Sequence, residues 1–399
     1  MISIDLFGTS HTKEMGAVIR GIPADAELDM DFIQKQLDRR KPGGTLTSER
    51  KESDIPRVEK RNPLVVVFKN EDVSDEAYDE LELIPRPGHS DYTYYAKGGS
   101  FIKGGATSAR LTAPMVFAGA IAKKELLKRG IDVTAKLFEA GGEKDPAKIV
   151  KAIEQVKAEG DSLGGVVECT VTGLEPGFGG VYFQKLEASI SSAVFSVPAV
   201  KGLEFGKGFE SAGLKGSENN DEFVFEDGRV ITKTNNCGGL LGGMSDGMPL
   251  VLRAAFKPTP SIAKEQWTVN LKTGENVKIS VGGRHDPCVA LRGVVVIESM
   301  VALAIYDHLL AEDKLFASRS NIDFANENLL NLFLFRMEEA KKIGEFKREK
   351  GLPVTDKARE EEIIQKVRED SGDMADYAEA FFRNLIELSK KYQEHLSED

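Results

Sequence analysis

The sequence predicts two domains of different fold class, an α+β domain over residues 1–312 and an all-helical domain over residues 313–399. Three observations lead to this prediction. Glycine is frequent up to Gly293, and only Gly344, Gly351 and Gly372 follow it. The first part of the chain mixes strand-like and helix-like stretches, whereas the second part has helical periodicity alone. A length of 399 residues is also ample for two domains.

Apolar and β-branched runs predict strands in the first domain at residues 64–68, 165–172, 250–255 and 294–296. Amphipathic or apolar stretches predict helices at residues 31–39, 112–129, 143–159, 189–197 and 297–310. Neither a dinucleotide-binding glycine fingerprint nor a P-loop follows any of the predicted strands. The pattern therefore favours a layered α+β sandwich over a doubly wound parallel sheet.

The composition limits the classes of function. A net charge of −11 argues against general binding to nucleic acids or to membrane surfaces. Cys169, Cys237 and Cys288 are too widely spaced for a zinc site, so we expect no metal and a reducing compartment. No apolar run approaches the roughly 20 residues of a spanning helix, and no secretory signal is visible. We therefore expect a soluble cytoplasmic protein.

The helical region places several polar residues on shared helix faces. Arg336 and Lys347 lie eleven residues apart, close to a whole number of turns, and Ser389 and Gln393 form an i,i+4 pair. A helix that points an arginine and a lysine inward needs an anion to offset the desolvation of both cations. Residues 311–318 should connect the two domains, and Asp356 or Thr355 should cap a helix over residues 356–368. The apolar stripe of the first helix would consist of Leu329, Leu330, Phe333, Leu334 and Met337.

In their order and spacing, the polar residues of this region resemble the helical type of chorismate mutase, over about residues 316–396. The resemblance implies three helices that pack with those of a second subunit, around a site for chorismate that needs no cofactor. Arg336 and the partner subunit's Arg319 would bind the carboxylates, with help from Ser389. Lys347 and Gln393 would donate to the ether oxygen. Arg359 and Glu360 would orient the hydroxyl side of chorismate. Asp356 belongs to the same pattern and would be a further substrate-binding residue.

The chemistry of such a site agrees with its residues. A Claisen rearrangement has no nucleophile and no proton transfer, so catalysis depends on holding a compact conformer and on donors aimed at the charge that develops on the ether oxygen. A site rich in arginine and lysine, without a catalytic histidine or cysteine, suits that task. The alternative is that these charges form the solvated surface of an ordinary helical tail.

Five segments of the first domain combine glycine with histidine or arginine, at residues 7–12, 38–43, 86–110, 235–261 and 283–288. Glycine lets backbone N–H groups approach a phosphate, and nearby arginine or lysine neutralises it. Taken singly, such segments are more often turns. Together they resemble chorismate synthase over residues 7–310, with the strongest matches at RPGHSDYTY, GGLLGGMS, KPTPSI and GRHDPCV.

This second resemblance implies a layered β-α-β sandwich that converts 5-enolpyruvylshikimate 3-phosphate to chorismate and phosphate with reduced FMN. His11 would protonate the leaving phosphate, His89 would lie beside the flavin, and Asp286 would assist proton removal near flavin N5. The substrate anions would be bound by Arg39, Arg40, Arg110 and Arg292. FMN would contact Ala106, Thr107, Ser108, Ala199, Gly242, Lys257, Pro258, Thr259, Pro260, Ser261 and Arg284.

Several positions depart from the pattern of the synthase family. Gly-Thr-Ser-His-Thr replaces the usual Gly-Glu-Ser-His-Gly, Leu111 replaces a glutamate, and Leu46 stands where an arginine is usual. Ala106, Thr107 and Ser108 replace Arg-Ser-Ser, and the stretch between Glu52 and Leu64 is short. These departures leave open the FMN contacts and the reductant, for which NADPH is one candidate.

The two resemblances are chemically linked, because the product of one reaction is the substrate of the other. We therefore interpret the chain as a bifunctional enzyme of aromatic amino-acid biosynthesis that acts on small molecules. We expect it to be a homo-oligomer, either a tetramer or a dimer through the helical domain. One alternative is a synthase whose tail only binds chorismate or drives assembly. Another is a mutase attached to an inactive synthase.

Overall fold

The computed structural model describes residues 1–10, 12–42, 46–48, 52–71, 83–98, 107–282, 285–312 and 314–395. It divides into two compact units. We call Met1–Asp313 the sandwich unit and Lys314–Asp399 the helical unit. Each is described by itself below.

The first sheet of the sandwich unit is antiparallel and has the order β1-β2-β4-β3. Alternate residues of its central strands, such as Ala17 and Val66, are fully buried, so one face of the sheet packs against helices. Its strands are β1 (Ser3–Phe7), β2 (Glu14–Arg20), β3 (Pro56–Arg61) and β4 (Leu64–Lys69).

The second sheet is also antiparallel and has the order β5-β6-β12-β7. Val167, Cys169 and Val171 on β6 alternate with more exposed residues, as expected for a strand with one buried face. The strands are β5 (Asp132–Ala140), β6 (Gly165–Thr172), β7 (Val200–Phe205) and β12 (Leu250–Phe256). Three small hairpins are formed by β8 (Phe223–Glu226) with β9 (Arg229–Thr232), β10 (Leu240–Leu241) with β11 (Met244–Ser245), and β13 (Gln266–Val269) with β14 (Asn276–Ile279).

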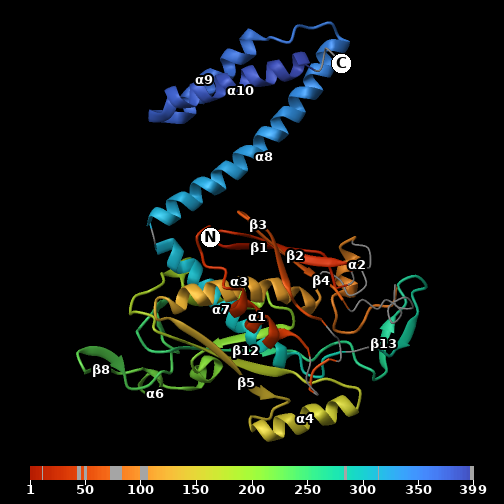
Figure 1. Ribbon diagram of the computed structural model, residues 1–399, viewed down its shortest axis with the longest axis vertical. Helices are drawn as coiled ribbons and strands as arrows, with labels where there is room; N and C mark the ends of the chain where they lie inside the picture. Colours follow the sequence, from red (N-terminus) through yellow and green to blue (C-terminus); the bar gives the residue numbers. More distant parts are fainter. Residues whose placement is uncertain are drawn as a thin grey trace. The chain divides into compact units, whose positions relative to one another are not determined.

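Three helices, α1 (Met30–Arg40), α3 (Thr112–Leu127) and α7 (Ala290–Glu312), lie between the two sheets and complete a β-α-β sandwich (Figure 1). At the α3–α7 crossing a Cβ on Gly119 would lie 2.2 Å from Cβ of Ser299, so only glycine permits this approach. Shorter helices are α2 (Asp91–Ala96), α4 (Pro146–Ala158), α5 (Leu186–Phe195) and α6 (Gly216–Asn219). Among the described residues, α7 is the one helix long and apolar enough to cross a membrane, but most of it is buried inside the sandwich, as in the core helix of a soluble protein.

The helical unit consists of α8 (Lys314–Glu349), α9 (Lys357–Ser371) and α10 (Ala375–His395). Asp356 caps α9, since its side chain accepts a hydrogen bond from the backbone N–H of Arg359 at 3.1 Å. Among the side chains of this unit that the structure describes, few are buried, namely Ala340, Ile364, Ile386 and Ser389.

The predicted fold classes are confirmed for both parts of the chain, and the strand predicted at residues 165–172 is confirmed to the residue. Two local predictions are wrong. Residues 294–296 belong to α7, because the apolar run continues on both sides and is a buried helix rather than a strand. Residues 311–318 are not a loop, because α7 extends to Glu312 and α8 begins at Lys314.

Candidate active sites

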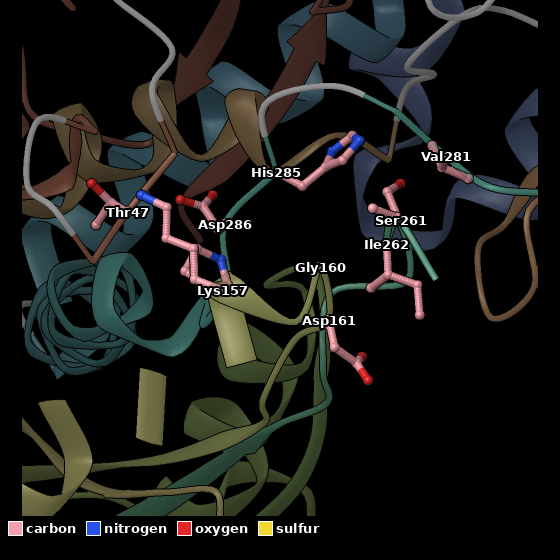
Figure 2. A pocket seen from close by; sticks show the side chains of 11 residues that line it. Thr47, Lys157, Gly160, Asp161, Ser261, Ile262, Val281, His285 and Asp286 are labelled. Carbon is pink, nitrogen blue, oxygen red and sulfur yellow. The ribbon is translucent and has the colours of Figure 1, made fainter. Parts of the chain in front are cut away.

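A cavity of about 240 Å³ opens in the sandwich unit beside Asp286. Figure 2 shows Thr47, Lys157 and Asp286 on one side of it and Ser261, His285 and Val281 on the other. The wall thus combines two carboxylates, Asp161 and Asp286, an ammonium group, an imidazole and hydroxyls with a comparable share of apolar atoms. Burial lowers the pKa of His285, so this imidazole favours its neutral form.

Asp286 is held at this wall by three different elements. Its Oδ2 accepts a hydrogen bond from Arg292 Nη1 on α7 at 2.6 Å, and its Oδ1 accepts one from the backbone N–H of Ser48 at 2.9 Å. Its backbone carbonyl accepts a hydrogen bond from Thr259 Oγ1 at 2.8 Å. Asp286 is therefore held in place by three elements: residues 257–261, which we call the KPTPS loop, the backbone of Ser48, and the start of α7.

Two predicted anion-binding arginines are buried around one carboxylate. Asp54 Oδ2 accepts from Arg40 Nε at 3.0 Å and also from Arg40 Nη2, while Asp54 Oδ1 accepts from Arg110 Nη1. Burial alone would raise the pKa of Asp54, but the two guanidinium groups outweigh it and hold that pKa below its usual value. Arg292 joins the same cluster, because its Nε donates to the backbone carbonyl of Arg40 at 2.8 Å.

Arg110 also contacts Asn70, which in turn holds the turn around position 11. Arg110 Nε donates to Asn70 Oδ1 at 3.1 Å. Asn70 Nδ2 donates to the carbonyls of Thr9 and Thr12 at 3.0 and 2.6 Å. The buried arginine cluster is thereby connected to Thr9 and Thr12, which stand two residues before and one residue after His11 in the chain.

Arg39 makes different contacts from its neighbour Arg40. It forms two parallel hydrogen bonds to Glu298 on α7, at 2.7 and 2.9 Å, and Lys123 on α3 contacts the same carboxylate at 2.6 Å. Glu298 is only 2% exposed and also accepts from the backbone N–H of Ala135 on β5. Arg39 therefore lies in an ion-pair cluster that ties the layers together, and its contacts are not shared with the Arg40–Asp54–Arg110 cluster.

His89 lies in a third cluster, within the RPGHSD motif. Its Nδ1 is 2.5 Å from Asp91 Oδ1, so the ring proton on Nδ1 is donated to the carboxylate, and Nε2 lies 3.2 Å from Arg86 Nη2. Burial opposes ionisation of Asp91, yet hydrogen bonds from Arg86 and His89 keep its pKa well below the ordinary value. Arg86 Nη1 also donates to Ser261 Oγ at 3.1 Å, which brings this cluster to the cavity wall.

The KPTPS loop meets the other predicted cofactor residues at two points. The backbone N–H of Lys257 donates to the carbonyl of Ala199 at 2.9 Å, and Lys257 Nζ donates to the carbonyl of Gly88. Thr107 Oγ1 is 2.6 Å from Ser90 Oγ, beside the RPGHSD motif, and Ser108 accepts from the backbone N–H of Arg110. Lys257, Ser261 and Thr107 of the predicted set thus contact the RPGHSD motif directly.

Gly242 lies apart from that set. It forms the turn between β10 and β11, with φ of +66°, at the start of β12, whereas Lys257 follows the end of β12. Seven extended residues span about 23 Å. The structure of one chain therefore does not bring Gly242 to the KPTPS loop.

The predicted anion-binding residues of the helical unit lie mostly along the contact of α8 with α10. Arg336 Nη1 donates to Ser389 Oγ and to the carbonyl of Leu385, and burial lowers the pKa of Arg336. Gln393 packs against Gly344, and its Oε1 is buried without a hydrogen-bond partner among the described residues. Lys347 is one helical turn beyond Gly344, and its Nζ donates to the carbonyl of Val354 at 2.7 Å.

The remaining predicted residues of this unit are on α9. Glu360 pairs with Lys390 of α10 at 3.3 Å. Arg359 pairs with Glu362 one turn along α9, and both side chains are exposed. The structure therefore groups Arg336, Ser389 and Gln393 along one helix contact and leaves Arg359 on the surface of the single chain.

Three predicted residues, His11, Ala106 and Arg284, lie outside the described residues, and the side chain of Arg319 is not described either. The sequence did not reveal the side chains that contact the predicted site residues and hold them in place, namely Asp54, Glu52, Asn70, Asp91 and Glu298. Only Asp91 had a visible signal, since it stands inside the RPGHSD motif. Asp54 and Asn70 are single polar residues at strand ends, and nothing in their spacing marks them.

Comparison with known proteins gives two family matches. A family model described as chorismate synthase matches residues 2–310, and a model described as chorismate mutase type II matches residues 318–394. A chorismate synthase of Korarchaeum cryptofilum is 43% identical over 342 residues, which cover 76% of this chain and 94% of the relative. One of Archaeoglobus fulgidus is 43% identical over 349 residues, covering 78% of this chain and 96% of the relative. A crystal structure of chorismate synthase is similar with a TM-score of 0.58 and 24% identity over 82% of this chain and 98% of that one, which shows the shared fold.

Proposed function

The chain belongs to the chorismate synthase family and continues into a type II chorismate mutase domain, and from this premise we propose how its own residues divide the work of the two reactions. The chain is a bifunctional shikimate-pathway enzyme. The observation that carries the assignment of residues is the continuous network that begins with Asp286 at the cavity wall and runs through Arg292 and Arg40 to Asp54 and Arg110. We propose that the boundary between the two domains lies at residues 312 and 313; the two compact units divide one residue later, between Asp313 and Lys314.

In the first reaction a ring carbon loses a proton, a second ring carbon loses phosphate with the bonding electrons, and a new double bond forms. His11 donates the proton that the leaving phosphate takes up, since imidazole titrates near neutral pH. Asp286 assists proton removal at the cavity wall. Arg40, Arg110 and Arg292 fix the anionic groups of the substrate, while Arg39 acts in holding the layers together through Glu298.

The residues around the KPTPS loop fit reduced FMN. Burial and the neighbouring charge of Lys201 lower the pKa of Lys257, and an anionic phosphate would relieve both effects. Ser261, Thr259, Ala199, Thr107 and Ser108 provide further hydroxyl and backbone groups nearby. When bound, reduced FMN supplies transient electron donation to an elimination that has no net redox change. NADPH is the reductant we propose for the flavin.

His89 lies beside the cofactor and helps to keep the protonation state of the flavin. Asp91 and Arg86 contact its imidazole ring and hold it in place. Gly242 lies too far from this set within one chain. We propose that it reaches the cofactor of a neighbouring copy in a homo-oligomer.

In the second reaction the helical unit holds chorismate in a compact conformer. Arg336, supported by Ser389, binds one carboxylate, and the partner subunit's Arg319 binds the other. Lys347 and Gln393 donate to the ether oxygen, where negative charge develops. Glu360, Arg359 and Asp356 act at the hydroxyl side. The partly buried Arg336 supports this assignment, because a cation that loses water gains more from an anion than an exposed one does.

We propose a cytoplasmic homo-oligomer, with neither nucleic acid nor membrane as a partner. A single assay tests both activities. The purified chain receives 5-enolpyruvylshikimate 3-phosphate and chemically reduced FMN without oxygen, and phosphate, chorismate and prephenate are followed together. Phosphate release with accumulation of prephenate is the expected result. Chorismate without prephenate would leave the tail as a binding or assembly module, and conversion of added chorismate without phosphate release would mean an inactive synthase.

Two variants assign the activities to their units. Lys347→Ala should abolish prephenate formation and leave phosphate release unchanged, whereas His11→Ala should abolish phosphate release and still convert added chorismate to prephenate. An unchanged mutase rate in Lys347→Ala would overturn the site proposed for the helical unit.

A further inference from the structure

We propose that Asn70 is a positioning residue of the synthase reaction: it holds the backbone of Thr9 and Thr12, which stand on either side of His11 in the sequence, in register with the arginine cluster. This inference rests on the proposed role of His11 as the proton donor. It concerns a residue that follows β4 and faces the turn from Thr9 to Thr12.

The carboxamide of Asn70 uses both of its ends. Its nitrogen donates to the carbonyls of Thr9 and Thr12, the residues two before and one after position 11. Its oxygen accepts from Arg110 Nε. Its backbone N–H also donates to the carbonyl of Lys13 at 3.0 Å. Asn70 is only 6% exposed, so these hydrogen bonds are shielded from water.

Thr12 makes further hydrogen bonds within this turn. Thr12 Oγ1 donates to the carbonyls of Thr9 and Glu14, at 2.9 and 2.7 Å, and accepts from the backbone N–H of Thr9. These bonds close the turn upon itself and upon β2. Asn70 instead joins the turn to Arg110, a residue at the start of α3, and through Arg110 to Asp54. It therefore fixes where the turn stands relative to the groups that bind the substrate.

Only an amide can do this, because it donates twice and accepts on one planar group. Aspartate has nearly the same shape and can still accept from Arg110, but it has no proton for the carbonyls of Thr9 and Thr12. Misplacing a proton donor lowers kcat more than it weakens substrate binding, since a shift of about 1 Å can lower turnover about 100-fold. Asn70→Asp should therefore lower kcat for phosphate release by at least tenfold and change KM less than threefold.

The experiment measures kcat and KM of the full chain, normalised to the amount of FMN bound, for Asn70→Asp, Asn70→Ala and His11→Ala. Asn276→Asp is the matched control, because it adds the same charge on the exposed strand β14. A purely structural role would reduce the fraction of protein that binds FMN and leave kcat per bound FMN unchanged. If Asn70→Ala fails to bind FMN, Thr12→Val loosens the same turn from the other side and should also lower kcat.

The decisive comparison is the double variant His11→Ala, Asn70→Asp. If Asn70 acts through His11, the double variant should be no slower than His11→Ala alone. Additive losses would overturn the inference, and so would an unchanged kcat in folded Asn70→Asp. If His11→Ala itself keeps the wild-type kcat, the proposed function of His11 fails, and the inference about Asn70 falls with it.

Discussion

The two units of this chain differ in how completely each buries its core residues within a single chain. In the sandwich unit, α3 and α7 are covered by two sheets, and charged groups as large as Arg40 are buried with partners from the same chain. In the helical unit, α8 leaves Ile322, Leu329, Leu332, Ile343 and Phe346 about half exposed or more. Their spacing of three, seven and eleven residues places these five on one side of the helix, while Phe324, Leu330 and Leu334 are exposed on its other sides.

The difference indicates which site needs a second copy. A contiguous apolar side on a long helix is typical of a surface that another subunit covers. The sandwich unit already contains most of its proposed synthase groups in one chain, whereas the proposed mutase site includes the partner subunit's Arg319. The following variants test this contrast, from the largest expected effect to the smallest.

The largest effect should come from Asp54→Ala, which removes the carboxylate shared by Arg40 and Arg110. Breaking a buried ion pair from one side destabilises by about 3–5 kcal/mol, because the remaining charge is buried and uncompensated. The free energy of unfolding can be followed in urea through Trp267, the single tryptophan of the chain, which reports on the sandwich unit alone. Glu59→Ala is the control, since its ion pair with Arg57 is exposed and should matter by less than about 1 kcal/mol. Equal effects of the two variants would contradict the account of the cluster.

A second large effect should follow from Leu332→Glu, which puts a charge on the exposed apolar side of α8. Dimerisation through this helix should be lost, and the mutase rate should fall at least tenfold because the partner subunit's Arg319 is then absent. Light scattering and the prephenate assay measure the two consequences, and phosphate release should persist. Lys366→Glu on the exposed side of α9 changes the charge without touching this surface and should alter neither. A fully active monomer would show that one chain is enough.

Acid should unfold the sandwich unit first. The pKa values of Asp54, Asp91 and Glu298 are held below their ordinary values of 3.8, 3.8 and 4.5 in the folded state. Their ionised forms therefore contribute stability that is complete above those values and declines as the pH falls below about 4. Fluorescence of Trp267 should change in this range before the helical circular dichroism of α8–α10 is lost. Loss of helicity first would mean that these carboxylates do not limit the acid stability.

The smallest effect should be that of Gly344→Ala. A Cβ at this position would lie 3.0 Å from Cγ of Gln393, so the Gln393 side chain must shift by a few tenths of an ångström. Alanine favours a helix by up to about 1 kcal/mol over glycine, which offsets the crowding. Stability should change little, whereas the mutase rate should fall severalfold because Gln393 is displaced. The outcome that contradicts this is an unchanged mutase rate.

The sequence was sufficient for the fold class of both units and for most helices and strands, since periodicity reports which side of an element is buried. It failed at residues 294–296 and 311–318, where an apolar run and a polar run both continue as helix. The residues that carry chemistry were visible through motifs. The residues that hold them, such as Asn70 and Asp54, were not, because their role depends on contacts between β4, the turn before β2 and α3 that are far apart in the chain.

The ion pairs of Glu298 with Arg39 and Lys123 should respond to ionic strength differently from the exposed ion pairs of the helical unit. Salt shortens the range of electrostatic attraction to about 3 Å at 1 M, but it acts through solvent and hardly reaches a carboxylate as buried as Glu298. The exposed pairs that link α9 to α10, such as Arg368 with Glu379 and Arg383 with Glu361, have no such protection. Concentrated salt should therefore leave the layers of the sandwich joined while it weakens the electrostatic ties between the helices of the other unit.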